Sequence, residues 1–159
     1  MSLFGIFLAG ILSCIAMDFW QRLLLALFKI PTSNWAMVGR WLILFAGSFK
    51  WVQESLSDHG AIRGELLIGW LFHYFVGILY ALFYALLWSL NLIDLGIVPG
   101  FLFGLVSTVV PWFLFMPAMG AGVLSRKSET QLFNLFLAMM THIVFGVSLG
   151  LVFSYTYVG

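Results

Sequence analysis

Four long runs of apolar residues divide the chain, and each is about as long as a helix that crosses a membrane. The runs cover residues 3–28, 66–90, 97–116 and 132–155, the first being clearest up to Gln21. A spanning helix needs roughly 20 apolar residues. Only helices and closed barrels satisfy their backbone in lipid, and these runs are too long and too unalternating for barrel strands. We therefore predict an all-α integral membrane protein whose residues 1–159 form one domain, a four-helix transmembrane bundle.

The composition agrees with this prediction and excludes a water-soluble protein. Of the 159 residues, 63% are hydrophobic and only 8% are charged, whereas soluble domains carry roughly 25% charged residues. A net charge of +1 without a large basic patch argues against nucleic-acid binding. The single cysteine, Cys14, allows neither an intrachain disulfide nor a cysteine metal cluster. The first run has no basic leader and no convincing cleavage site, so we expect a retained membrane helix.

The positive residues gather in two of the three connecting loops. Five lie after Gln21, where the clear part of the first run ends, and before the second run, namely Arg22, Lys29, Arg40, Lys50 and Arg63. The third loop carries Arg126 and Lys127, whereas the second, residues 91–96, carries Asp94 and no positive residue. Positively charged loops stay in the cytoplasm. The sequence therefore predicts cytoplasmic first and third loops and places both termini in the periplasm or outside.

The first loop contains an apolar segment, residues 34–51, that is unusual for a solvated connection. It is short for a span and has Arg40 in its middle, while Trp35, Trp41 and Trp51 suit a membrane–water interface. We interpret it as an interfacial or re-entrant helix. A fifth spanning helix is the alternative, and it would place the two termini on opposite sides of the membrane.

Two pairs of segments indicate an internal duplication. Gly10–Cys14 aligns with Gly104–Thr108, and His73–Gly77 aligns with His142–Gly146. The chain then reads as two helical hairpins that enter the membrane from the same side, with the interfacial segment added to the first. Such parallel repeats place binding sites at the interface between the copies. Coincidence is the alternative, because glycine and serine are common in membrane helices.

Two histidines, His73 and His142, fall inside predicted spanning helices. They lie roughly 11–15 Å from the cytoplasmic starts of their helices, at 1.5 Å per residue. Ionisable side chains in a membrane are costly to bury and mark candidate functional sites. Asp18 on the first helix falls in a similar layer. These three residues could form a ligand site or a proton pathway, or they could bind a metal ion.

Other interpretations of these residues stay open. His73 and His142, as the only histidines in the predicted spans, could ligate at most one bis-histidine haem. Each could instead hydrogen-bond across helices in a purely structural role. Asp18 could pair with Arg22 on the same helix. Glu65, at the start of the second span, is a further candidate for the ligand or proton pathway, although the positive helix terminus suffices to explain a carboxylate there.

Two prolines, Pro111 and Pro117, interrupt the third run. Proline inside a membrane helix frees a backbone carbonyl and kinks the helix. We expect residues 116–122 to be irregular. Met116 and Met119 could be soft ligands for Cu(I), but methionine more often fills gaps in packed helices.

Several segments in combination resemble a bacterial family of small inner-membrane proteins known as domain of unknown function 2938. They are Met17–Trp20, Gly39–Trp41, His73–Ala81, Pro111 with Met116–Gly120, and Thr141–Gly146. The resemblance covers nearly the whole chain. It implies a bacterial inner, cytoplasmic membrane and marks Asp18, Arg40, His73 and His142 as positions of interest. It supplies no activity, substrate or cofactor.

Three functions follow from these observations as hypotheses. The first is a small transport or permeation component with an intramembrane His/Asp site, acting as a homo-oligomer. The second is a haem- or metal-binding redox protein. The third is a non-catalytic subunit or scaffold that packs against a larger membrane-protein partner. No nucleotide-binding loop or nucleophile–base pair is visible, so enzymatic activity is not predicted.

Overall fold

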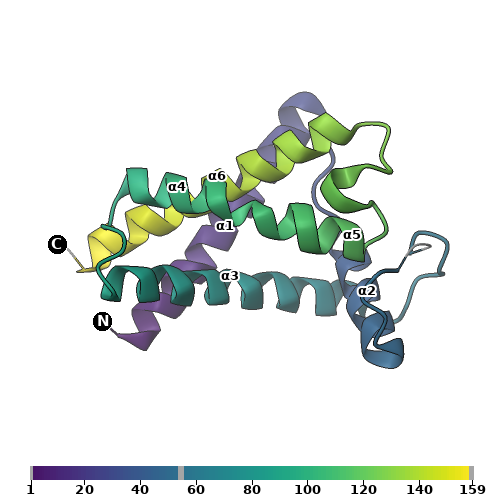
Figure 1. The fold of residues 1–159 in the computed structure, drawn as a ribbon, viewed down its shortest axis with the longest axis horizontal. Coiled ribbons are helices and arrows are strands. Elements are labelled where there is room, and N and C mark those ends of the chain that lie inside the picture. The colour runs from purple at the N-terminus through teal and green to yellow at the C-terminus, as the bar shows by residue number, and fades with distance from the viewer. Residues whose placement is uncertain (1, 54–55, 158–159) are drawn as a thin grey trace. The chain divides into compact units, whose positions relative to one another are not determined.

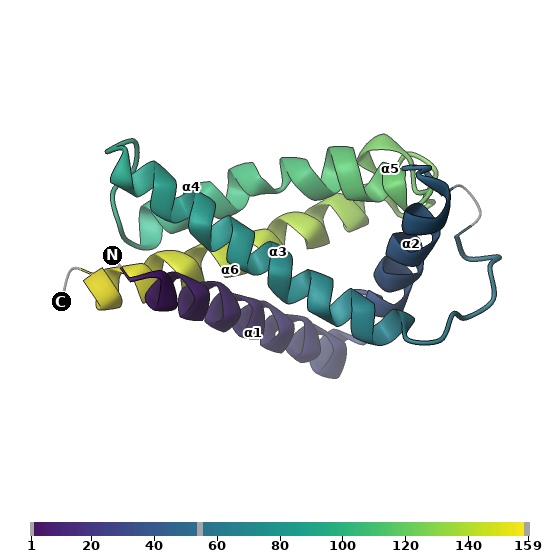
Figure 2. The same cartoon turned by 90° about the horizontal axis from the view of Figure 1, so that it is seen from below.

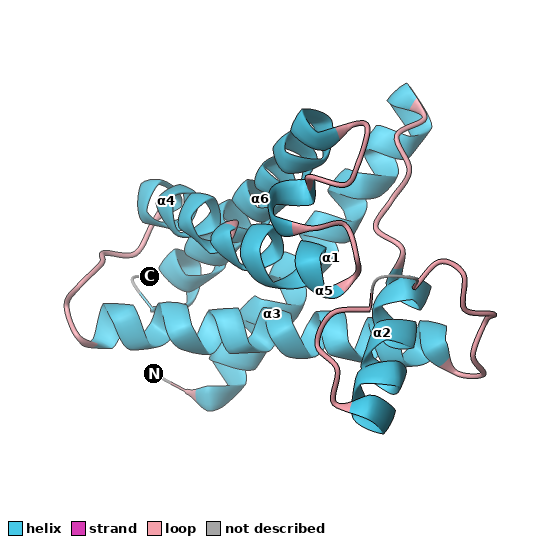
Figure 3. Ribbon diagram, turned by 45° about the vertical axis from the view of Figure 1, so that its right-hand side comes forward, coloured by secondary structure: helices cyan, strands magenta, loops and turns pink. Residues whose placement is uncertain are grey.

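The computed structural model describes residues 2–53 and 56–157, which form helices joined by loops (Figures 1 and 3). In chain order these are α1 (Leu3–Phe28), α2 (Trp35–Ser48), α3 (Glu65–Ser89), α4 (Ile97–Ser107), a π-helix (Pro111–Phe115), α5 (Met116–Ala118), a 3₁₀ turn (Val123–Ser125) and α6 (Gln131–Tyr157). No strand occurs in the described ranges. The prediction of an all-helical protein is confirmed.

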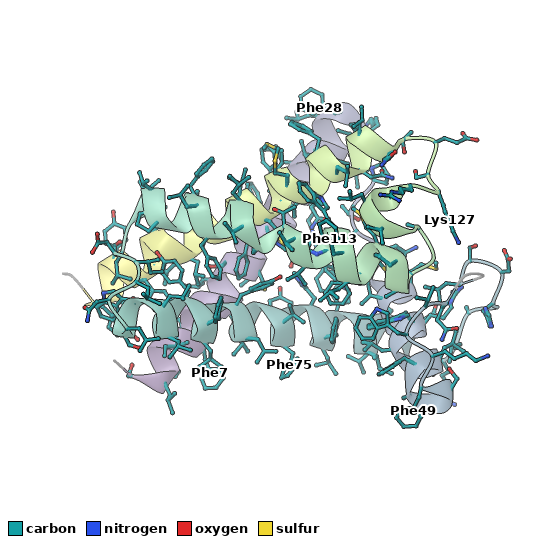
Figure 4. The ribbon with its side chains drawn as sticks, in the orientation of Figure 1. Phe7, Phe28, Phe49, Phe75, Phe113 and Lys127 are labelled. Atoms are coloured by element: carbon teal, nitrogen blue, oxygen red, sulfur yellow. The ribbon has the colours of Figure 1, made fainter. Side chains whose placement is uncertain are left out.

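Four of the described helical segments are long and apolar enough to cross a membrane. They are Leu3–Phe28, Glu65–Ser89, Ile97–Ala118 and Gln131–Tyr157. Their apolar side chains cover the outside as well as the inside of the helices, because lipid rather than water surrounds them. Figure 4 shows Phe7 and Phe75 pointing outward, and both side chains are more than 40% exposed. The four predicted spans are confirmed, and the chain is a membrane protein.

The third span is not a continuous α-helix. The regular part, α4, ends at Ser107, and a π-helix follows over Pro111–Phe115. Proline has no backbone N–H, so Pro111 cannot donate to the carbonyl of Ser107 one turn earlier. Short π-helical segments inside helices frequently occur at functional sites. The predicted irregularity after Met116 is present too, because Gly120 and Gly122 adopt positive φ angles of 85° and 76°.

The helices pack into two compact units. The first consists of residues up to Thr32, Tyr74–Ser107 and the residues from Met139 onward. The second consists of Ser33–His73 and Thr108–Ala138. The helix α3 therefore contributes its first residues to the second unit and the remainder to the first.

Glycines bring the helices of the first unit into backbone contact. A methyl group at Gly10 of α1 would lie 2.9 Å from the carbonyl oxygen of Gly77 in α3. A methyl group at Gly104 of α4 would overlap the backbone of His142 in α6, and Gly146 faces Gly104 in the same way. Small residues allow membrane helices to approach this closely. The glycines aligned by the sequence repeat thus occupy equivalent contacts, and the duplication itself stays a prediction.

In the second unit, α2 packs across the beginning of α3. A methyl group at Gly39 would overlap the carbonyl of Glu65, and one at Gly69 would overlap the carbonyl of Trp35. Trp41 forms the centre of a core with Leu56 and Ala118. Trp41 is only 2% exposed and faces protein, whereas its depth at the membrane–water interface stays a prediction. The apolar pattern could not separate a side chain facing lipid from one facing protein.

The two chain ends of the first unit lie together. The hydroxyl of Tyr157 donates to the carbonyl of Ser2 at 3.0 Å, and Figures 1 and 2 show the N and C labels at the same end. The start of α1 and the end of α6 therefore lie side by side in the first unit. The interpretation of residues 34–51 as an interfacial or re-entrant helix, with a fifth span as the alternative, stays a prediction.

Candidate functional site

His142 on α6 is held by a hydroxyl group from α4. The Oγ atom of Ser107 lies 3.0 Å from Nδ1 of His142. The ring of Tyr80 on α3 presents its edge to the imidazole, with the ring centroids 6.0 Å apart. Three helices of the first unit thus meet at one ionisable side chain, and we call Tyr80, Ser107 and His142 the polar node.

The hydroxyl of Ser107 has two possible hydrogen-bond partners, and its choice depends on the tautomer of His142. The Ser107 hydroxyl also lies 2.8 Å from the carbonyl oxygen of Gly104, which can only accept. A serine hydroxyl carries one proton. When that proton is donated to Gly104, the Oγ atom accepts from Nδ1–H of His142; in the other tautomer the hydroxyl donates to Nδ1 instead.

The proline of the third span explains why Tyr80 joins the polar node. Pro111 leaves the Ser107 carbonyl without its usual helical donor. The hydroxyl of Tyr80 lies 3.5 Å from this oxygen and supplies a long hydrogen bond. Sequence reasoning missed both Tyr80 and Ser107. The available signal was the proline four residues after a serine, which exposes a carbonyl inside a membrane helix.

Asp18 on α1 accepts a hydrogen bond from a tyrosine of α3 other than Tyr80. The hydroxyl of Tyr74 donates to Oδ2 of Asp18 at 3.1 Å. Tyr74 and Tyr80 are six residues apart, which corresponds to about 9 Å along a helix. Asp18 and His142 thus meet α3 at two levels, which differs from the single layer expected from the sequence. Both belong to the first unit, and each is held by a hydroxyl from a neighbouring helix.

His73 has aromatic surroundings in the second unit. Its imidazole stacks on the indole of Trp35, with centroids 4.1 Å apart and an interplanar angle of 25°. Trp70 lies at its edge, with centroids 5.7 Å apart. The side chain is buried. The two histidines of the sequence repeat therefore have different environments, one aromatic and one hydroxylic.

A shared metal or haem stays a prediction. Within the described ranges, no group of three or more histidine, cysteine, aspartate or glutamate side chains is arranged to hold a metal ion. The contact of Ser107 with Nδ1 of His142 resembles the outer hydrogen bond that orients metal-ligating histidines. The same contact equally suits a histidine that exchanges protons.

Arg40 and Glu65, the remaining predicted site residues, form an ion pair with two hydrogen bonds. Arg40 Nε and Nη2 contact the two carboxylate oxygens at 2.8 and 2.9 Å. Arg40 also donates to the carbonyl of His59 at 2.7 Å, and Glu65 accepts from the backbone N–H of Ile62 at 2.9 Å. The hydrogen bonds that Arg40 donates to Glu65 raise the pKa of Arg40 above its usual value. These contacts fasten the segment before α3 to α2, and a part for Arg40 and Glu65 in a ligand or proton pathway stays a prediction.

A family model described as "Protein of unknown function (DUF2938)" matches residues 7–156 of the chain. The chain belongs to this family. The match includes the second and third spans, all but the outer ends of the first and fourth, and every residue of the polar node. No curated protein and no solved structure matches the chain. The resemblance expected from the sequence motifs is confirmed, and the function has to be argued from the site.

Proposed function

We propose that the protein is a small transport or permeation component of the membrane, in which Asp18 and His142 take up and release protons. One observation carries the proposal. Two ionisable side chains inside spanning helices of one unit are each held by a hydroxyl group from a neighbouring helix. Ionisable groups in membrane helices are costly, and they mark ion and proton pathways.

The break in the third span supports the same function. Transporters often place their binding sites where a spanning helix is interrupted, because the interrupted backbone offers polar groups inside the membrane. Here α4 ends at Ser107, the residue that contacts His142. The proposal also places the protein in the bacterial inner membrane with both termini periplasmic. Four spanning helices are few for a transport protein, so we propose that the chain acts as a homo-oligomer.

Proton flux through liposomes that contain the purified protein tests this function. A pH-sensitive dye inside the vesicles reports an imposed pH gradient, and valinomycin with potassium clamps the membrane potential. We expect wild type to dissipate the gradient faster than protein-free vesicles. Asp18→Asn and His142→Gln should slow the flux to nearly the protein-free rate, because each replaces a titratable group with an amide of similar size.

Asp94→Asn is the matched control. It makes the same change at an exposed aspartate outside the four spans, so the flux should stay at the wild-type rate. All variants should elute from gel filtration at the wild-type volume. A wild-type rate equal to that of empty vesicles, or equal rates for wild type, Asp18→Asn and His142→Gln, would contradict proton permeation.

A further inference from the structure

The helix α2 lies at the beginning of a spanning helix. Its contacts with α3 involve Gly39, Gly69 and the ion pair between Arg40 and Glu65. The α3 residues in these contacts, Glu65 and Gly69, lie within the first two turns of the helix. At 1.5 Å per residue, these partners lie within about 6 Å of the point where α3 begins. The position of α2 is therefore close to a membrane boundary.

The chain leaves α2 in a turn that exposes large apolar side chains. We call residues 49–52 the α2 tip. Phe49 is 83% exposed, and Trp51 and Val52 are 41% and 46% exposed. Figure 4 shows Phe49 pointing away from the end of α2. Trp41, about two turns earlier in α2, is buried and its ring contacts that of Trp51, so the exposure of the α2 tip does not result from a lack of core in this unit.

Several hydrogen bonds hold the turn after α2 in one conformation. Phe49 has a φ of 54°, which residues other than glycine rarely adopt, and its N–H donates to the carbonyl of Phe45 at 2.7 Å. The carbonyl of Trp51 accepts from Nε1 of Trp41 at 2.8 Å. At Lys50, the N–H reaches Oγ of Ser48 and the carbonyl accepts from Gln53. A backbone satisfied in this way can enter a poorly hydrated region, where unpaired groups are costly.

A positive charge accompanies the apolar side chains. Lys50 stands between Phe49 and Trp51 and is exposed. Aromatic rings prefer the headgroup region of a bilayer, and lysine extends its charge toward lipid phosphates. Basic residues near an anionic leaflet each contribute about 1 kcal/mol of attraction. A lysine between two aromatic residues, at positions 49–51, therefore matches the chemistry of an anionic membrane surface.

We propose that the α2 tip inserts into the headgroup region of an anionic leaflet, with Phe49 and Trp51 among the upper acyl chains and Lys50 at the phosphates. The first part of α2 is fixed to protein through Gly39 and Arg40, and the tip binds lipid. The helix thus connects the start of a span to the bilayer surface. This inference is independent of the proton pathway.

Site-specific fluorescence in vesicles tests the insertion. In a Cys14→Ala background, a single cysteine replaces Phe49 or, as the control, Ser57, an exposed position of the same loop. Each is labelled with the polarity-sensitive dye NBD and reconstituted with phosphatidylglycerol or with phosphatidylcholine alone. Lipids with a nitroxide near the headgroup or deep in the acyl chain serve as quenchers. We expect blue-shifted emission at 49 that shallow quenchers reduce more than deep ones, and water-like emission at 57.

The Lys50→Glu variant tests the contribution of the lysine charge to insertion of the α2 tip. It should reduce quenching at position 49 in phosphatidylglycerol vesicles and leave it unchanged in phosphatidylcholine. Water-like emission at 49 would overturn the proposal. Blue-shifted emission without quenching by either lipid would overturn it too, because a protein partner or a second copy would then cover the tip. Loss of quenching without dependence on lipid charge in Lys50→Glu would contradict the role given to Lys50.

Discussion

Replacing Gly146 with alanine should destabilise the protein by about 3 kcal/mol, near the upper end for overpacking a tight contact. The added methyl group would overlap the carbonyl oxygen of Gly100 and lie 2.6 Å from the backbone nitrogen of Gly104. Backbone atoms cannot rotate away as a side chain can, so α4 and α6 must separate. Unfolding in detergent micelles, followed by circular dichroism against denaturant or temperature, measures the loss.

Gly47→Ala makes the same change in α2, where nothing lies within 4 Å of the added methyl group. Alanine is favoured over glycine in a helix by roughly 0.5–1 kcal/mol. This control should therefore be neutral or slightly more stable than wild type. Equal stability of Gly146→Ala and Gly47→Ala would show that α4 and α6 are not in backbone contact.

Trp41→Ala should cost about 3–5 kcal/mol, as expected for removing a large aromatic side chain from a packed core. Trp41 is 2% exposed and its indole meets the rings of Phe72 and Phe115 edge-on. Trp41→Phe should cost less. It retains much of the packing but leaves the carbonyl of Trp51 without its donor, a loss of about 1–3 kcal/mol.

The exposed Phe49 provides the comparison in the same unit. Phe49→Ala removes an aromatic ring that is 83% exposed, so the unfolding transition should change little in micelles. If Trp41→Ala were as harmless as Phe49→Ala, Trp41 would face detergent rather than a protein core.

The sequence predicted the spans because lipid imposes a simple requirement. A helix that crosses a membrane must be long and apolar, and those two properties can be read along the chain without knowing its neighbours. For the same reason, the sequence pattern does not show which apolar side chains face the interior of the bundle. Lipid and a protein core are similarly apolar, so the pattern could not tell that Trp41 faces protein while Phe49 and Phe75 do not.

The site was predicted only in part, for a related reason. His142 and Asp18 stood out because ionisable side chains are rare in spans. Their partners, Ser107 and Tyr74, come from other helices, and no local pattern encodes which helices are neighbours. Arg40 and Glu65 were grouped with the site, but they stand 25 residues apart and fasten α2 to α3. Their pairing could be recognised only once the helices were placed.

Flux through Ser107→Ala compared with Ser154→Ala tests the role of the polar node most directly. Each serine hydroxyl donates to a carbonyl of its own helix at 2.8 Å, but only Ser107 contacts a histidine. If the hydrogen bond to Nδ1 holds His142 in the state that exchanges protons at Nε2, Ser107→Ala should reduce flux toward the rate of His142→Gln. Ser154→Ala should keep the wild-type rate. Wild-type flux in Ser107→Ala, with the protein folded, would contradict proton exchange at the polar node.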